Sequence, residues 1–583
     1  MPDQETPEPG PSPAPPAGPV TPGRGEAPPS AAPNGVLVSR RRVLVGGASL
    51  LVIGAAGGAG MLALTGAGTS PTRADVTPSP AAASASPVPL PSEPGSLESP
   101  DTSPGDEVIE SAPPAGPARV PRENQLRGSR RWELPLTGTG DAEGYASDAS
   151  VAPGDTLTIR VRSSASRVSV TAYRLGFYGG LGGRPVARWK DLPVAAQPDP
   201  TTDPATGLIR AEWSPAVSVP VPASWVSGLY AAVLQPAGGT AQYVTFVVRE
   251  ASPSAPILML SAASTHQAYN RWGGKSLYPD GSTGAPTVRG NAAAVAVSFD
   301  RPYEELRGGG MVLRWEYPFV RWLEQHGYDV GYAADLDLDR NPAIVAGRRL
   351  LVLVGHPEYW SVAMRRTLER AIAAGTNVAF FSGNEMLWRS RYENLAGGPY
   401  RSLTCYRVAS LDPLAATQPE LVTTKWREPP NPEPEAAVIG QMAGHIVLAP
   451  GDFVCTAPEH WVYAGTGMAA GDSIRRLVGQ EYDGFWPQYA PPNTQVISAS
   501  PVSSNATRNS SVYGPVPSND PTAATANATV YTAASGATVF AAGTIQWSWG
   551  LDSWGNPDYQ GYHTPPDPRV GVMTANILDR LGS

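Results

Sequence analysis

The chain is poor in the side chains that most often carry catalysis through sulfur or zinc. Its 583 residues include two cysteines, Cys405 and Cys455, and six histidines. The cysteines do not form a Cys-x-x-Cys pair, which excludes a zinc ribbon. Neither follows a strand and turn with a histidine nearby, which argues against a cysteine nucleophile.

Two common catalytic motifs and an excess of positive charge are also missing. There is no Gly-x-Ser-x-Gly sequence and no His-Glu-x-x-His helix, which argues against a serine nucleophile elbow and a zincin site. The formal net charge is -8, and no basic stripe is present. Because nucleic-acid binding relies on clustered Lys and Arg, we set aside a nucleic-acid partner.

Composition divides the chain into regions. Residues 1–38 and 75–120 are rich in Pro, Gly and Ala and are predicted to be disordered, the second as a linker. Residues 121–251 show the alternation of a β-sandwich. Residues 252–583 show the longer apolar segments of an α/β domain with a mostly parallel sheet. The predicted fold class is therefore α+β and multidomain.

Residues 39–74 resemble a twin-arginine export signal. Ser39-Arg40-Arg41-Arg42-Val43-Leu44 precedes an uncharged segment that reaches about residue 67. We expect an extracellular or cell-envelope protein, attached to the membrane if the segment is not cleaved. A single-span anchor is the alternative, because the segment is long enough to cross a bilayer. An exported protein is exposed to oxidation, so we expect Cys405 and Cys455 to form a disulfide.

Four segments between 156 and 248 alternate apolar and polar residues, as half-buried antiparallel strands do: 156–161, 168–173, 228–234 and 243–248. Short strands separated by Gly, Pro and Asp turns predict a β-sandwich of immunoglobulin type. The aromatic residues Tyr173, Phe177 and Tyr178 favour either a core or interface position or a sugar-binding surface.

Two short apolar segments, 350–354 and 377–381, predict neighbouring parallel strands joined by a helix that Ser361 caps. Ligands of open α/β sheets bind beyond the carboxyl ends of such strands. His356 and Glu358 follow the first strand, and Asn384 follows the second. Near the end of the chain, residues 545–550 are predicted to form another strand and residues 570–581 a helix.

Several segments together resemble the large, or beta, subunit family of N,N-dimethylformamidase. They are Ala268-Tyr269-Asn270, Ser276-Leu277-Tyr278, Ser298-Phe299-Asp300-Arg301-Pro302, Gly355-His356-Pro357-Glu358-Tyr359-Trp360-Ser361 and Ser382-Gly383-Asn384 with Trp388-Arg389. The resemblance extends over roughly residues 121–583. It implies a catalytic domain with a glutamine-amidotransferase-like fold.

The resemblance also implies a mononuclear iron site held by two tyrosines and one glutamate, beside a histidine and an asparagine. Matched by motif, the ligands are Tyr269, Tyr278 and Glu358, and the catalytic residues are His356 and Asn384. Tyr303 is the substitute for the second tyrosine. Formamidases of this family carry a much longer tyrosine region and a separate small subunit, so the resemblance does not transfer their substrate.

The residues and the resemblance predict an exported hydrolase that cleaves an amide carbon–nitrogen bond through metal-activated water. The hard anionic oxygens of the proposed ligands suit an oxophilic metal ion. His356 would move the proton from water to the leaving amine, and Asn384 would donate a hydrogen bond to the developing oxyanion. The expected partner is a small-molecule amide, and the oligomeric state stays open. Two alternatives remain: a non-catalytic envelope protein with a glycan-binding sandwich, and a carbohydrate-active enzyme that pairs Glu358 with Asp300.

Overall fold

The computed structural model describes residues 118–504, 523–555 and 563–583. The predicted tail, the signal segment and the linker up to residue 117 lie outside these ranges. Within the described residues, no helix is long and apolar enough to span a membrane.

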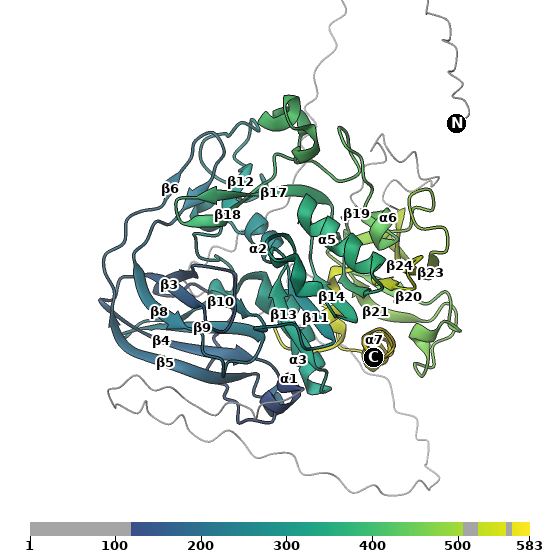
Figure 1. The fold of residues 1–583 in the computed structure, drawn as a ribbon, viewed down its shortest axis with the longest axis horizontal. Helices are drawn as coiled ribbons and strands as arrows, with labels where there is room; N and C mark the ends of the chain where they lie inside the picture. Colours follow the sequence, from purple (N-terminus) through teal and green to yellow (C-terminus); the bar gives the residue numbers. More distant parts are fainter. Residues whose placement is uncertain (1–117, 505–522, 556–562) are drawn as a thin grey trace, which may run out of the picture. The chain divides into compact units, whose positions relative to one another are not determined.

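Most strands between residues 142 and 248 belong to two sheets (Figure 1). One has the order β1 (Ala142–Ala146), β3 (Thr156–Ser163) and β8 (Pro215–Pro220), and the other has the order β2 (Ser150–Val151), β10 (Gln242–Val248), β9 (Gly228–Pro236), β4 (Arg167–Leu175) and β5 (Gly183–Pro193). Apolar side chains of both sheets share one core, to which β3 contributes Leu157 and Ile159 and β9 contributes Tyr230 and Leu234. The four alternating segments of the sequence all lie in these strands.

Strands β9 and β10 are buried on both faces, although their alternation predicts one exposed face. In β9, Tyr230 and Ala232 belong to the core between the two sheets. Leu229 and Ala231 point the other way and join a second core with Ile257 of the following region. The prediction of half-buried strands is therefore wrong for this pair, because another part of the chain covers their second face.

The remaining large sheet is mixed. Its seven strands have the order β13 (Val330–Ala334), β11 (Ile257–Ser261), β14 (Leu350–Gly355), β16 (Asn377–Ser382), β25 (Thr538–Ala541), β24 (Ala523–Thr532) and β23 (Gln495–Ser503). Each neighbouring pair among the first five strands is parallel. Strand β24 pairs antiparallel with both of its neighbours, β25 and β23. The fold is thus α+β with mixed sheets, and its carboxyl-terminal part holds a mostly parallel sheet.

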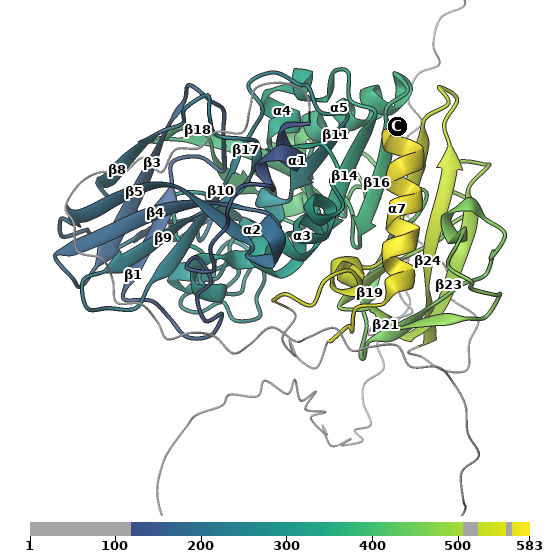
Figure 2. The same ribbon diagram turned by 90° about the horizontal axis from the view of Figure 1, so that it is seen from below.

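Helices cover both faces of this sheet, which explains its continuous apolar strands (Figure 2). Leu351 and Leu353 of β14 pack with helix α5 (Val362–Ala373). Val352 and Val354 face the opposite core, which includes residues of α3 (Tyr317–Gln325) and α7 (Pro568–Gly582). The predicted helix over residues 570–581 is confirmed as part of α7.

A smaller sheet carries the loops that reach the carboxyl end of β14. Its order is β12 (Ala296–Ser298), β18 (Gly398–Thr404), β17 (Trp388–Leu395) and β15 (Tyr359–Ser361). Helix α2 (Ala263–Tyr269) follows β11 directly. Other short elements are α1 (Arg119–Glu123), α4 (Asp337–Arg340), α6 (Ala436–Ile439) and the paired strands β6 (Thr201–Thr202) with β7 (Ile209–Arg210), β19 (Met442–Ile446) with β22 (Glu481–Gly484), and β20 (Gly451–Val454) with β21 (Ser473–Val478).

Two expectations about the second half of the chain are wrong. Residues Ile545–Gly550 form a 3-10 helix rather than a strand, because the chain leaves the sheet after β25 and Thr544 caps the new helix through its hydroxyl. Cys405 and Cys455 are both buried and unbonded, so they do not form the expected disulfide. They lie after different strands, β18 and β20, in different sheets.

Candidate active site

The site is built on the loop that joins β14 to β15. Gly355 ends β14 with a φ of 74°, and a Cβ there would lie 2.5 Å from the Cβ of Trp315, so only glycine fits. The loop then presents His356 and Glu358. The hydroxyl of Thr265 in α2 accepts the backbone N–H of Glu358 at 2.9 Å, which anchors the loop to the helix.

Tyr269 and Tyr278 bring two phenol oxygens to the Glu358 carboxylate. Tyr269 ends α2, and Tyr278 lies in the segment that follows. The Tyr278 hydroxyl lies 2.6 Å from the Tyr269 hydroxyl and 2.7 Å from Oε2 of Glu358. The two tyrosine rings are 4.2 Å apart between centroids. The structure therefore brings together three oxygens from two distant segments.

His356 connects this oxygen cluster to a second group of polar residues. Its Nε2 lies 3.4 Å from Oε2 of Glu358 and 3.2 Å from Oε2 of Glu481. Asn384 places its side-chain nitrogen 3.3 Å from the same Nε2 and donates a hydrogen bond to Glu481. All five residues chosen from the sequence thus lie in one connected cluster.

The backbone at Asn384 is held in an unusual conformation. Its φ is 59°, in the left-handed region that non-glycine residues rarely adopt. The backbone N–H of Asn384 donates to Oδ1 of Asp483 at 2.7 Å, which supports this conformation. Strain of this kind accumulates at functional sites, where surrounding contacts maintain it.

Among the side chains that contact the cluster, sequence reasoning missed Glu481 and Trp388. Glu481 begins β22, more than one hundred positions after His356, and no local motif marks it. Trp388 lies at the start of β17, and its indole N–H donates to Oε1 of Glu358 at 2.8 Å. Trp388 belongs to a segment that carried the family resemblance, which was the available signal for it.

Burial and mutual charge control the protonation of the cluster. Burial raises the pKa of both phenols well above their usual value, and the nearby Glu358 raises the pKa of Tyr269 further. Burial also raises the pKa of Glu358, against the lowering effect of His356. Burial by itself lowers the pKa of His356, but the carboxylates of Glu481 and Glu358 raise it above its ordinary value.

The donor atoms fit a hard metal ion such as iron. Tyr269, Tyr278 and Glu358 offer anionic oxygens once deprotonated, and a nearby cation is what would favour that state in so buried a site. Among the described residues, His356, Glu358 and Glu481 form a second group, whose ligand atoms lie within 4.8 Å of one another. The two donor sets share Glu358.

The residues considered as alternatives at this site have other contacts or are unreactive. Tyr303 does not join Glu358, and its ring instead faces His266 at 6.4 Å. Asp300 is paired with Arg401 at 2.5 Å. The fully buried thiol of Cys405 has its pKa raised to about 12, so it is not a ready nucleophile.

The aromatic residues considered for sugar binding in the sandwich are covered. Tyr173 and Tyr178 are buried, and the Tyr178 hydroxyl donates to Glu123 at 2.8 Å. The guanidinium of Arg321 lies 5.8 Å from the ring centre of Phe177. These contacts favour the core or interface interpretation.

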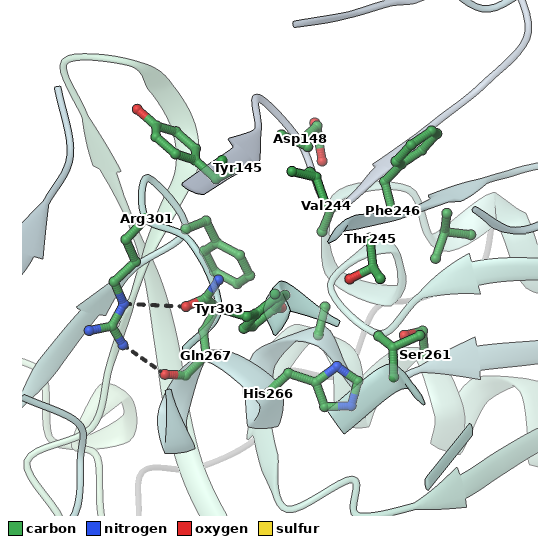
Figure 3. A pocket seen from close by; sticks show the side chains of 18 of the residues that line it. Tyr145, Asp148, Val244, Thr245, Phe246, Ser261, His266, Gln267, Arg301 and Tyr303 are labelled. Atoms are coloured by element: carbon green, nitrogen blue, oxygen red, sulfur yellow. Dashed lines mark hydrogen bonds between the residues drawn. The ribbon is translucent and has the colours of Figure 1, made fainter. Parts of the chain in front are cut away.

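A separate hollow lies beside helix α2 (Figure 3). Its volume is about 40 Å³, and its lining includes Tyr145, Phe246, His266 and Tyr303. None of the five predicted site residues lines it. Helix α2 thus presents His266 to this hollow and Tyr269 to the oxygen cluster.

A family model described as N,N-dimethylformamidase beta subunit-like, C-terminal, matches residues 169–563. No curated protein matches the chain. The matched range includes the whole cluster around Glu358.

Proposed function

The chain belongs to the N,N-dimethylformamidase beta subunit-like family, and we propose that it is a metal-dependent hydrolase that cleaves the carbon–nitrogen bond of a small amide. One observation carries the proposal. The phenol oxygens of Tyr269 and Tyr278 meet the Glu358 carboxylate beside His356, at the carboxyl end of a central strand.

Tyr269, Tyr278 and Glu358 are the residues proposed to hold a single iron ion. When bound, such an ion polarises a carbonyl oxygen and lowers the pKa of water. With these three protein ligands, the ion would still be able to bind water and substrate. The N–H of Trp388 keeps the Glu358 carboxylate oriented, since it binds Oε1 and leaves Oε2 toward Tyr278 and His356.

His356 is proposed to transfer the proton that hydrolysis must move. As water attacks the carbonyl carbon, its proton passes to Nε2 of His356, and from there to the nitrogen as the carbon–nitrogen bond breaks. Glu481 lies 3.2 Å from Nε2 and stabilises the imidazolium between these events. This explains why a carboxylate from a distant strand meets the histidine.

Asn384 is proposed to position His356 and Glu481 and to assist the substrate. Its amide nitrogen carries two hydrogens, and one is directed to Glu481. The second is available to the oxygen of the tetrahedral intermediate while His356 is protonated. An oxyanion donor of this kind is worth about 3 to 4 kcal/mol when it is deleted in other enzymes.

The proposal is tested by metal analysis of the purified protein and of Glu358→Gln. We expect about one iron per chain in the wild type, a visible phenolate-to-iron charge-transfer band, and the loss of both in Glu358→Gln with the circular dichroism spectrum unchanged. Glu420→Gln is the matched control, because Glu420 is exposed and outside the cluster. A wild-type protein that binds no metal when refolded with iron contradicts the proposal.

We also propose the finer fold assignments and the export route. The shared core of the two sheets supports an immunoglobulin-type sandwich over residues 121–251, and the mostly parallel sheet supports a glutamine-amidotransferase-like domain over residues 252–583.

The Ser39–Leu44 motif supports twin-arginine export. Replacing Arg40 and Arg41 with lysine is expected to retain the protein inside the cell, as fractionation would show.

A further inference from the structure

Arg407 lies at the edge of the oxygen cluster and is held there by aromatic rings. Its guanidinium carbon is 3.7 Å from the ring centre of Tyr278 and 4.5 Å from the ring centre of Trp388. One of its nitrogens donates to the hydroxyl of Tyr359. These contacts place a permanent positive charge beside both a proposed iron ligand and the indole that orients Glu358.

The hydrogen-bonding edge of Arg407 is largely unused. Among the described residues, no carboxylate lies within ion-pair distance of it, and its buried Nε has no hydrogen-bond partner. Two fully or largely buried arginines, by contrast, are paired with carboxylates: Arg174 lies 2.7 Å from Glu324, and Arg184 lies 2.5 Å from Glu123. Arginine stacked on aromatic rings keeps its N–H groups free for planar, two-point binding of a carboxylate.

The backbone conformation of Arg407 and a nearby cation also support a binding role for this residue. Arg407 has a φ of 64°, which is unusual for a residue with a side chain. Strained backbone of this kind is concentrated at functional sites. Arg289 is a second nearby cation: burial lowers its pKa, and Arg407 lowers it further. Tyr278, Tyr359 and Glu358 raise the pKa of Arg407, so its guanidinium stays charged beside Arg289.

We propose that Arg407 binds the carboxylate of the substrate, so that the amide hydrolysed is one that carries a carboxylate a few atoms from its carbon–nitrogen bond. N-acyl or N-formyl amino acids have this chemistry. The inference rests on the proposed function for its meaning, but anion binding at Arg407 can be measured without turnover.

The test compares two probes, N-formylglycine and its neutral amide, N-formylglycinamide. Binding to the full-length protein is measured by calorimetry for the wild type, Arg407→Met, Arg407→Lys and the control Arg475→Met, whose arginine is exposed. We expect the wild type and Arg475→Met to prefer the carboxylate. Arg407→Met should lose about tenfold to a hundredfold in affinity for N-formylglycine alone, with partial rescue in Arg407→Lys.

The outcomes separate this inference from the proposed function. Equal affinity for both probes in the wild type, or equal losses on both in Arg407→Met, overturns the inference. Failure of the wild type to bind N-formylglycine overturns it as well. Hydrolysis of only the neutral probe leaves the proposed function standing without the anion site. Selective binding through Arg407 with no hydrolysis of either probe leaves the anion site standing and counts against the hydrolase.

Discussion

At the scale of single residues, the cluster combines acids that resist ionisation with a histidine that favours it. Burial raises the pKa of Tyr269, Tyr278 and Glu358, and the surrounding carboxylates raise the pKa of His356. The surrounding carboxylates therefore stabilise His356 once it has accepted a proton, and a nearby cation is needed to favour deprotonation of the buried oxygens.

The role of His356 predicts a kinetic effect that is separate from metal binding. In His356→Ala, kcat on any amide that the wild type hydrolyses should fall by about 10² to 10⁴, because proton transfer is lost while the three oxygen ligands remain. His326→Ala is the control, since His326 is exposed and contacts the carbonyl of Trp322 in its own helix. Loss of iron in His356→Ala would show that the histidine is a ligand instead.

Asp335 predicts a measurable dependence of stability on pH. Burial raises the pKa of its carboxyl from 3.8 to about 8, against hydrogen bonds from backbone N–H groups. Between these two values the folded state holds a proton that the unfolded state has released, so the free energy of unfolding falls as pH rises through this window. Asp335→Asn stays neutral, and its melting temperature should decline less between pH 5 and pH 8.

Thermal unfolding at several pH values checks the prediction for Asp335. Asp280→Asn provides the comparison, because the Asp280 side chain is 84 % exposed. Parallel pH profiles for Asp335→Asn and the wild type would mean that Asp335 does not carry this dependence.

At the scale of elements, helix α5 connects the catalytic loop to the sheet. Ser361 ends β15 and caps the helix, accepting the backbone N–H of Met364 at 3.1 Å and donating to Asp339. The capping residue therefore lies three positions after Glu358, and the helix begins one residue later, at Val362. Local sequence predicts this cap well, because capping depends on one side chain and the next turn of backbone.

The cap of α5 predicts the effect of a single substitution. Ser361→Ala should lower the free energy of unfolding by about 1 kcal/mol, because the Met364 N–H loses its partner. Urea denaturation measures this change. Ser361→Thr retains a hydroxyl and should lose much less, so an equal loss in both variants would assign the effect to packing.

At the scale of the whole molecule, the described residues from 118 onward form one compact unit in which strands from the first half pack on helices of the second. The pair of Arg174 in β4 and Glu324 in α3 is fully buried at 2.7 Å. Glu324 also accepts hydrogen bonds from Asn124 at 2.6 Å and Tyr332 at 2.7 Å. These contacts satisfy charges that would otherwise be costly to bury.

This buried pair predicts non-additive effects on stability. Arg174→Met should destabilise the protein by about 3 to 5 kcal/mol, because Glu324 is left charged and without its cation. The double variant Arg174→Met, Glu324→Leu should be more stable than the single variant, since neither charge remains. Thermal unfolding distinguishes the two cases, and a double variant less stable than the single one would contradict this account.

The sequence by itself determined the features that depend on neighbouring residues. Apolar periodicity predicted β14, β16 and α7, and the Gly355–Ser361 segment located the loop that carries His356 and Glu358. Only the tertiary structure decided what meets across long separations. Glu481 contacts His356 although no motif links them, Tyr278 rather than Tyr303 joins Glu358, and β9 is covered on its second face. The physical reason is that turns, caps and alternation are set by local backbone chemistry, whereas the choice of distant partner follows from how buried surfaces pack.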